Sequence, residues 1–186
     1  MIGKKNIVFG FFYLVLTAAL GPYMVKAVFP DIAAAAAAKR ENMAALQLMV
    51  SNGFEADLEP LSAAEIARRN TGAILALNAQ LGMQEKLDAI KGGPHAHGNL
   101  EALLNIAAGL CLGFITVAPL FKQIISGLFL LGALLHSGLL YLAIVFEIPW
   151  AEQVLATGIG PVLLLAAVLL TGIAAAIGIR GQPVER

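Results

Sequence analysis

The sequence contains little cysteine, little charge and no familiar enzyme motif. Its one cysteine, Cys111, lies deep in an apolar run, which excludes a disulfide framework and a thiolate zinc site. The chain has no phosphate-binding loop, no Gly-x-Ser-x-Gly, no His-Glu-x-x-His and no Cys-x-x-Cys. Charged residues make up 13% of the chain and cancel to a net charge of zero, which gives no electrostatic footprint for nucleic acid.

Apolar residues are correspondingly abundant. They make up 59% of the 186 residues, and the mean hydropathy is +0.83. Soluble domains are nearer half apolar and a quarter charged. A soluble core of this size has no room for the excess, so the composition predicts an integral membrane protein with the lipid bilayer as its solvent.

Four apolar runs have about the 20 residues that a bilayer core requires. They cover residues 6–27, 99–121, 123–146 and 153–179. Lys122 is the only charge between the second and third runs, which predicts a tight turn there. The first run also fits a signal peptide, since it follows a basic start and ends in a small residue, but its length favours a retained span.

Most of the charged residues lie between the first two runs, where the pattern is that of two helices. Asp31 can cap a helix over residues 32–50, which contains six consecutive alanines. Ser62 and Glu65 form a capping box at the start of a helix over residues 63–91, and Gly92-Gly93-Pro94 stops it. We therefore predict a helical hairpin outside the membrane.

The predicted fold is all-α: a four-helix transmembrane bundle with an extramembrane helical hairpin between spans one and two. Residues 1–30 form the first span, 31–94 the hairpin and 95–186 the three-span bundle. The positive-inside rule orients it, because Lys4, Lys5, Lys122, Arg180 and Arg186 all fall on one side. Both termini are then cytoplasmic at a cell inner (plasma) membrane, and residues 31–98 are extracytoplasmic.

Polar residues inside spans are costly and therefore indicate function. Glu101 and Asn105 share one helix face, and His136 and Tyr141 lie in the next span. With a turn at Lys122, Tyr141 is expected at the depth of Asn105, and His136 about 7 Å deeper. These groups are expected to line one pocket, although His136 can also serve as a helix-packing residue.

His95 and His97 form a His-x-His pair at the start of the second predicted span. Such a pair is a metal-binding pattern, and it also fits a solvated helix entry. Gly109, Gly113, Gly127 and Gly132 are predicted to be positions where helices approach closely.

The stretches Asn99–Asn105 and Leu135–Tyr141 resemble spans of the styrene oxide isomerase group. Those proteins are small four-span membrane proteins that assemble as trimers and bind haem b. The resemblance implies a homo-oligomer and a haem, but the position of the haem-ligating histidine is Asn99 here. His97 or His136 would then have to be the ligand.

Two functions follow, and the sequence leaves open whether the protein is an enzyme. In the first, His97 or His136 holds a haem or a metal that acts as a Lewis acid on a lipophilic substrate. Asn105 and Tyr141 would orient the substrate oxygen, and Glu101 would carry a proton. In the second, the protein is a non-catalytic membrane-complex subunit or assembly factor, and its outer hairpin docks a partner.

Overall fold

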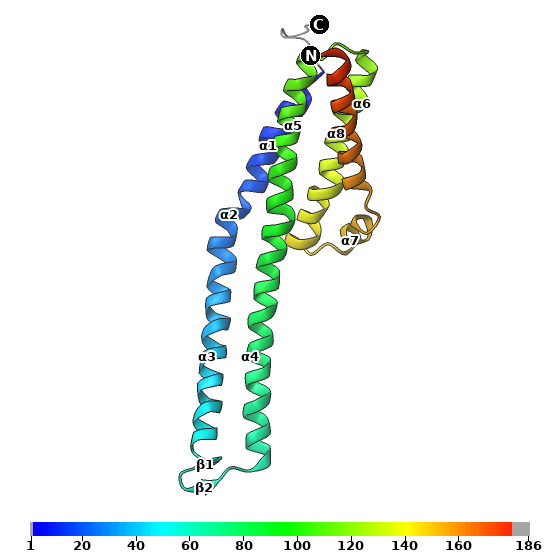
Figure 1. The fold of residues 1–186 in the computed structure, drawn as a ribbon. Helices are drawn as coiled ribbons and strands as arrows, with labels where there is room; N and C mark the ends of the chain where they lie inside the picture. The colour runs from blue at the N-terminus through cyan, green and yellow to red at the C-terminus, as the bar shows by residue number, and fades with distance from the viewer. Residues whose placement is uncertain (1, 180–186) are drawn as a thin grey trace. The chain divides into compact units, whose positions relative to one another are not determined.

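The computed structural model describes residues 2–179, which form helices joined by short loops and one two-stranded hairpin (Figure 1). The prediction of an all-α chain is therefore confirmed. The chain divides into two compact units, one of Met1–Gly21 with Ala89–Arg186 and the other of Pro22–Asp88. Each unit is described separately below.

Three helical stretches are long and apolar enough to cross a membrane: Lys4–Ser51, Pro119–Val145 and Ile159–Gly178. The first is a continuous path of several helices, and its 48 residues extend beyond the predicted span. The helix that corresponds to the second predicted span, α5, is not among the three. It carries Asn99, Glu101 and Asn105 within 19 residues, and these polar residues lower its hydropathy.

The first unit contains most of the apolar helices. Its helices are α1 (Lys4–Ala18), the π-helical turn η2 (Lys91–His95), α5 (Ala96–Phe114), α6 (Pro119–Ala133), the π-helical turns η3 (Leu134–Gly138) and η4 (Tyr141–Val145), α7 (Pro149–Leu155) and α8 (Ile159–Gly178). The short helix α2 (Leu20–Tyr23) follows α1 and leads into the second unit.

Small residues let α1 and α5 pack at close range. A Cβ atom built at Gly10 would lie 2.7 Å from the carbonyl oxygen of Ala102, and one at Gly109 would lie 2.6 Å from that of Gly3. The core of the unit lies beside this contact, where side chains of α5, α6 and α8 form one buried cluster that includes Leu112, Ile125, Phe129 and Leu164. Close backbone contact of this kind is typical of helices packed in a membrane.

The turn between α5 and α6 lies earlier than predicted. Helix α5 ends at Phe114, and α6 begins at Pro119, a residue whose fixed φ suits a first helical position. Lys122 is therefore inside α6 rather than in the turn, and it is buried. Its Nζ donates a hydrogen bond of 2.9 Å to the carbonyl oxygen of Leu112 in the last turn of α5, where the helix cannot bond that carbonyl internally.

The last predicted span is also shorter than expected. Gly158 adopts a left-handed conformation, with φ of +68°, and separates α7 from α8. At the other end of α8, the backbone N–H of Thr116 donates to the carbonyl oxygen of Gly178 at 2.6 Å. The end of α8 thus lies at the α5–α6 turn. Arg180 and Arg186 lie outside the described residues.

The second unit is the predicted helical hairpin. Helix α3 (Phe29–Ser51) follows the π-helical turn η1 (Met24–Val28), and α4 begins at Ala63 and ends at Ile90. Strands β1 (Glu55–Ala56) and β2 (Glu59–Pro60) pair antiparallel between the two helices (Figure 1). The two residues that join the strands, Asp57 and Leu58, both have positive φ, as a tight hairpin turn requires.

The hairpin caps were predicted in part. The capping box is confirmed, because the Glu65 carboxylate accepts from the Ser62 backbone N–H at 2.9 Å and from its hydroxyl at 2.7 Å. These hydrogen bonds lower the pKa of the exposed Glu65 carboxyl. The cap at Asp31 was wrong: the helical path runs on from η1, and Asp31 lies within the first turn of α3.

Candidate functional site

Polar side chains form a network inside the first unit, where α1, α5 and α6 meet. The network has three layers along α1, beginning at Asn6, Tyr13 and Thr17. All three of these side chains are at least nine-tenths buried. A buried polar group without a partner is costly in an apolar medium, so each layer has to be satisfied within the protein.

The first layer is made of amides that bond one another. Asn6 Nδ2 donates to Asn105 Oδ1 at 3.0 Å and to the carbonyl oxygen of Ser126 at 3.1 Å. Asn105 Nδ2 donates to the carbonyl oxygens of Glu101 at 3.0 Å and Phe129 at 3.3 Å. Ser126 Oγ donates to Asn6 Oδ1. The hydrogens of both amides are thereby used, which makes Asn105 a bridge between helices.

The central layer carries the titratable groups. The carboxylate of Glu101, 2% exposed, lies between His136 and Ser137. Its Oε1 is 2.5 Å from His136 Nδ1, and its Oε2 accepts from Ser137 Oγ. The Tyr13 hydroxyl in turn lies 2.8 Å from Ser137 Oγ. Since that Oγ donates to Glu101, the Tyr13 hydroxyl donates to it, and the chain of donors ends on the carboxylate.

This arrangement sets the tautomer of His136. A carboxylate can only accept, so Nδ1 carries the proton of this contact. Metal ligands must be deprotonated, so Nδ1 and Glu101 Oε1 can hold an ion together only when the ion takes the place of this proton. His136 lies in the π-helical turn η3, and such turns are frequent at functional sites.

His97 completes the cluster. Its ring contacts that of His136 edge to face, with centroids 4.8 Å apart and an angle of 62° between the planes. One donor atom from each of His97, Glu101 and His136 lies within 4.8 Å of the other two. Glu101 is buried, His136 is half-buried and His97 is exposed. Two imidazoles and one carboxylate therefore converge at one edge of the unit.

His95 belongs to the third layer and not to this cluster. Its Nδ1 lies 3.0 Å from the carbonyl oxygen of Thr17, so that nitrogen carries a proton. Thr17 Oγ1 donates to Asn99 Oδ1 at 2.8 Å. The predicted His95–His97 pair is thus divided, because His95 bonds to Thr17 in the third layer and the ring of His97 contacts His136 in the central one.

The predicted depths of Tyr141 and His136 were wrong. His136 lies at the level of Glu101, and Asn105 meets Phe129, so His136 is not deeper than Asn105. The difference follows from the early turn. Because α6 begins at Pro119, each later residue lies beside a residue nearer the start of α5 than predicted. Tyr141 lies in η4, where its ring is 5.6 Å from that of Phe146.

An apolar groove lies beside the network. It has a volume of about 590 Å³, within the range of small-molecule sites, and Tyr13 forms part of its wall. Most of the other lining residues are aliphatic or aromatic and come from η3, η4 and α7; among them are Gly138, Leu139, Tyr141, Phe146 and Trp150. Tyr13 thus has its ring in the groove and its hydroxyl in the network.

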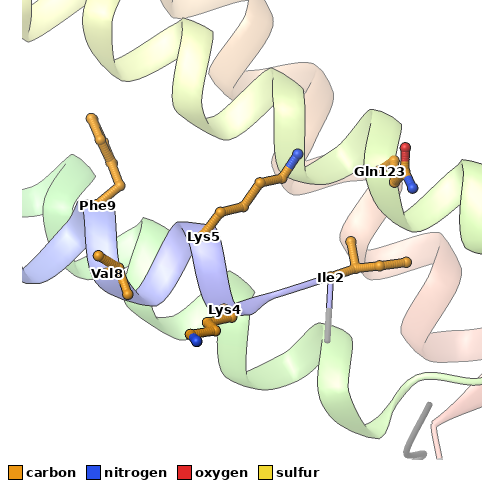
Figure 2. Close-up of a pocket in the computed structure, with 6 residues that line it drawn as sticks. All are labelled: Ile2, Lys4, Lys5, Val8, Phe9 and Gln123. Atoms are coloured by element: carbon orange, nitrogen blue, oxygen red, sulfur yellow. The ribbon is translucent and has the colours of Figure 1, made fainter.

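A second hollow, of about 700 Å³, lies elsewhere in the unit and has different chemistry. Its walls are Ile2, Lys4, Lys5, Val8, Phe9 and Gln123. Figure 2 shows Lys4 and Lys5 leaving α1 in different directions, with Gln123 on another wall. The hollow contains two cations and none of the cluster residues, so it is a cationic end of the unit rather than the candidate site.

The chain matches no protein-family model, and neither the curated proteins nor the solved structures include a significant match. The resemblance of Asn99–Asn105 and Leu135–Tyr141 to the styrene oxide isomerases therefore stays a prediction.

Five residues of the network were missed in the sequence: Asn6, Tyr13, Thr17, Ser126 and Ser137. Asn6 was assigned to the start of a span, and Tyr13 to its apolar body. A usable signal was present, because Asn6, Tyr13 and Thr17 recur at intervals of 7 and 4 residues in an otherwise apolar helix. That spacing places them on one face.

Proposed function

We propose that the protein is an integral membrane protein that binds a divalent transition-metal ion through His97, His136 and Glu101. The convergence of their donor atoms within 4.8 Å carries the proposal. Two imidazoles and a carboxylate are the donor set of catalytic zinc sites and of non-haem iron sites. Such sites keep a coordination position open, and the exposure of His97 leaves room for a substrate.

The contact between the rings favours an ion over a haem. His97 and His136 meet edge to face with ring centroids 4.8 Å apart, so a haem would be held by one of them alone. The Glu101 carboxylate beside His136 also supports an ion, because it offsets the ion's charge at a half-buried position.

In a four-span membrane protein, α5 would join the three long apolar stretches as a span and would carry the site. Glu101 is buried against η3 and Asn105 against α1 and α6, whereas outward residues such as Leu100, Leu103 and Leu110 are apolar and exposed. In this arrangement the groove beside Tyr13 faces the hydrocarbon, which supports a lipophilic substrate. The bound ion would polarise an oxygen of that substrate.

The proposal is tested by metal analysis of protein purified from membranes in mild detergent, together with titration of the metal-free protein with Co²⁺. Bound Co²⁺ reports its ligands through its visible absorption. We expect one ion per chain in the wild type and at least a tenfold weaker affinity in His97→Ala and in His136→Ala. Spectra of the oxidised and reduced protein show in the same sample whether haem is present.

His95→Ala is the matched control, since His95 is two residues from His97 and bonds to Thr17 instead. It should bind Co²⁺ as the wild type does. Equal loss in His95→Ala and His97→Ala would contradict the assignment, as would a wild-type protein that binds no Co²⁺. A Soret band that is present in the wild type and lost in His136→Ala would show that the bound group is haem and not a single ion.

A further inference from the structure

The hairpin unit exposes more apolar surface than a water-soluble helix pair normally does. On α4, Ile74, Leu77 and Leu81 are 59%, 40% and 46% exposed. On α3, Met43 and Val50 are 43% and 60% exposed. Large apolar side chains gathered on one structure indicate an interaction surface.

Small or polar side chains interrupt the contact within the hairpin. Most of the less exposed residues of α4 recur at alternating steps of three and four, as in a coiled-coil seam. These residues are Ile66, Gly72, Ala73, Ala76, Gln80, Met83 and Leu87. The less exposed residues of α3 are Ile32, Ala35, Ala36, Lys39, Asn42, Leu46 and Met49. About half of these positions are small or polar, so the seam buries less apolar surface than a seam of leucines would.

A second seam lies on the adjacent face of α4. Asn70, Ile74, Leu77, Leu81 and Gln84 follow the same alternating steps and are all exposed. Ile74 and Leu77 also line a hollow of about 290 Å³ between α4 and α3, opposite Met43 and Leu46. In heptad positions, Ile74 is an a residue and Leu77 a d residue, the combination that favours two parallel strands.

The charge pattern fits a partner identical to the chain itself. Residues 70–84 form 15 consecutive positions of an exposed helix without a lysine, arginine, aspartate or glutamate. Two copies in parallel register place each side chain beside its own equivalent, so any charge beside the seam would repel its copy. An uncharged helix face avoids that repulsion. Copies inserted into one membrane in the same orientation also present their hairpins in parallel.

We propose that the hairpin unit dimerises with a second copy of the chain through Asn70, Ile74, Leu77 and Leu81 of α4. The two α4 helices form a parallel seam, and Met43 and Val50 of α3 flank it. The result is a four-helix coiled coil outside the membrane. This proposal is independent of the metal site, because no residue of the cluster belongs to the hairpin unit.

The test is disulfide cross-linking of the full-length protein in membranes, in a Cys111→Ser background. Leu77→Cys places a thiol in the seam, and two d residues of a parallel dimer are close enough to form a disulfide. We expect mild oxidation to convert most of this variant to a covalent dimer. Ala79→Cys, which is exposed on the opposite face of α4, should stay monomeric on the gel.

Leu77→Glu gives a second measurement in the same protein. Two carboxylates in the seam should weaken dimerisation at least tenfold, as measured by light scattering in detergent, whereas Ala79→Glu should leave it unchanged. Equal cross-linking of Leu77→Cys and Ala79→Cys would overturn the proposal. So would cross-linking of Leu77→Cys only to a different protein, which would identify the seam as a docking site for another partner.

Discussion

The two units of this chain distribute polar and apolar side chains in opposite ways. In the first unit, Asn6, Glu101 and Asn105 are buried and hydrogen-bonded, while Phe12, Leu165 and Ile177 are more than 70% exposed. In the hairpin unit every charged side chain except Lys39 is exposed, as water favours. This is the distribution expected from the proposed membrane location, with hydrocarbon around the first unit and water around the hairpin.

The difference also explains what holds each unit together. At the proposed membrane location, the hydrocarbon outside a helix is as apolar as leucine, so apolar burial alone would do little to hold the first unit together. Close backbone contact and hydrogen bonds between helices would take its place. In water the hairpin needs apolar burial, which a seam with small or polar residues at about half of its positions supplies only in part. The apolar residues left exposed beside it are the physical reason to expect a second copy on the hairpin.

The largest effect is expected where helices of the first unit are in backbone contact. A Cβ atom at Gly160 of α8 would lie 2.6 Å from the backbone nitrogen of His136 and 2.6 Å from the carbonyl oxygen of Leu135. Backbone cannot move aside as a side chain can, so Gly160→Ala should destabilise the protein by about 1–3 kcal/mol. Thermal unfolding in detergent, followed by Trp150 fluorescence, measures this.

Gly172→Ala is the control in the same helix, because a Cβ there meets nothing within 4 Å. It should be neutral or stabilising by up to about 1 kcal/mol, from helix propensity alone. Gly160→Ala should also weaken Co²⁺ binding, since it displaces the backbone of η3 that carries His136. Equal melting temperatures for the two variants would contradict close packing of α8 on η3.

Periodicity in the sequence predicted the helices and the hairpin but not how the helices contact one another. Helices predicted over residues 32–50 and 63–91 are observed as Phe29–Ser51 and Ala63–Ile90. Of four glycines expected at close contacts, Gly109 and Gly132 lie there, while a Cβ at Gly113 or Gly127 meets nothing within 4 Å. Composition indicates that a residue can pack closely, but only the partner helix decides which face is used.

The cluster was predicted in its residue types but not in its grouping. His97, Glu101 and His136 were all candidates. His97, however, was paired with His95 and not with His136. The turn was placed at Lys122 because a lysine is costly inside a span. The structure resolves that cost differently, with Nζ bonded to the carbonyl of Leu112 inside the bundle. One misplaced turn then changed the register of every residue after it.

A smaller effect is expected at the buried amide pair. Asn105→Leu keeps a similar volume but removes the acceptor of Asn6 Nδ2 at 3.0 Å and the donor to the carbonyl of Phe129. Hydrogen bonds between helices in membranes average about 0.6 kcal/mol, so we expect destabilisation of about 1 kcal/mol. Unfolding in a denaturing detergent measures it. Leu103→Ala, at an exposed position of the same helix, should change less.

A double-mutant cycle with Asn6→Leu separates the pair from its surroundings. If Asn6 and Asn105 act through each other, the double variant should lose less than the sum of the single losses. Additive losses would contradict the direct contact.

The smallest effect is expected at the start of α4, where the contacts face water. Hydrogen bonds from the Ser62 hydroxyl and backbone N–H hold the pKa of Glu65 below its ordinary value of 4.5. A carboxyl whose pKa is lower in the folded state stabilises the fold above its unfolded pKa, and that contribution disappears as the pH falls through the folded pKa. Acidification below about pH 4.5 should therefore fray the first turn of α4.

Carboxyl NMR titration measures the pKa of Glu65 directly, and Ser62→Ala should raise it towards the ordinary value. If the pKa stayed low in Ser62→Ala, the capping box would not be its cause. The buried Asn6–Asn105 pair contains no titrating group and should not respond to the same change of pH, so acid separates the exposed contacts of the chain from the buried ones.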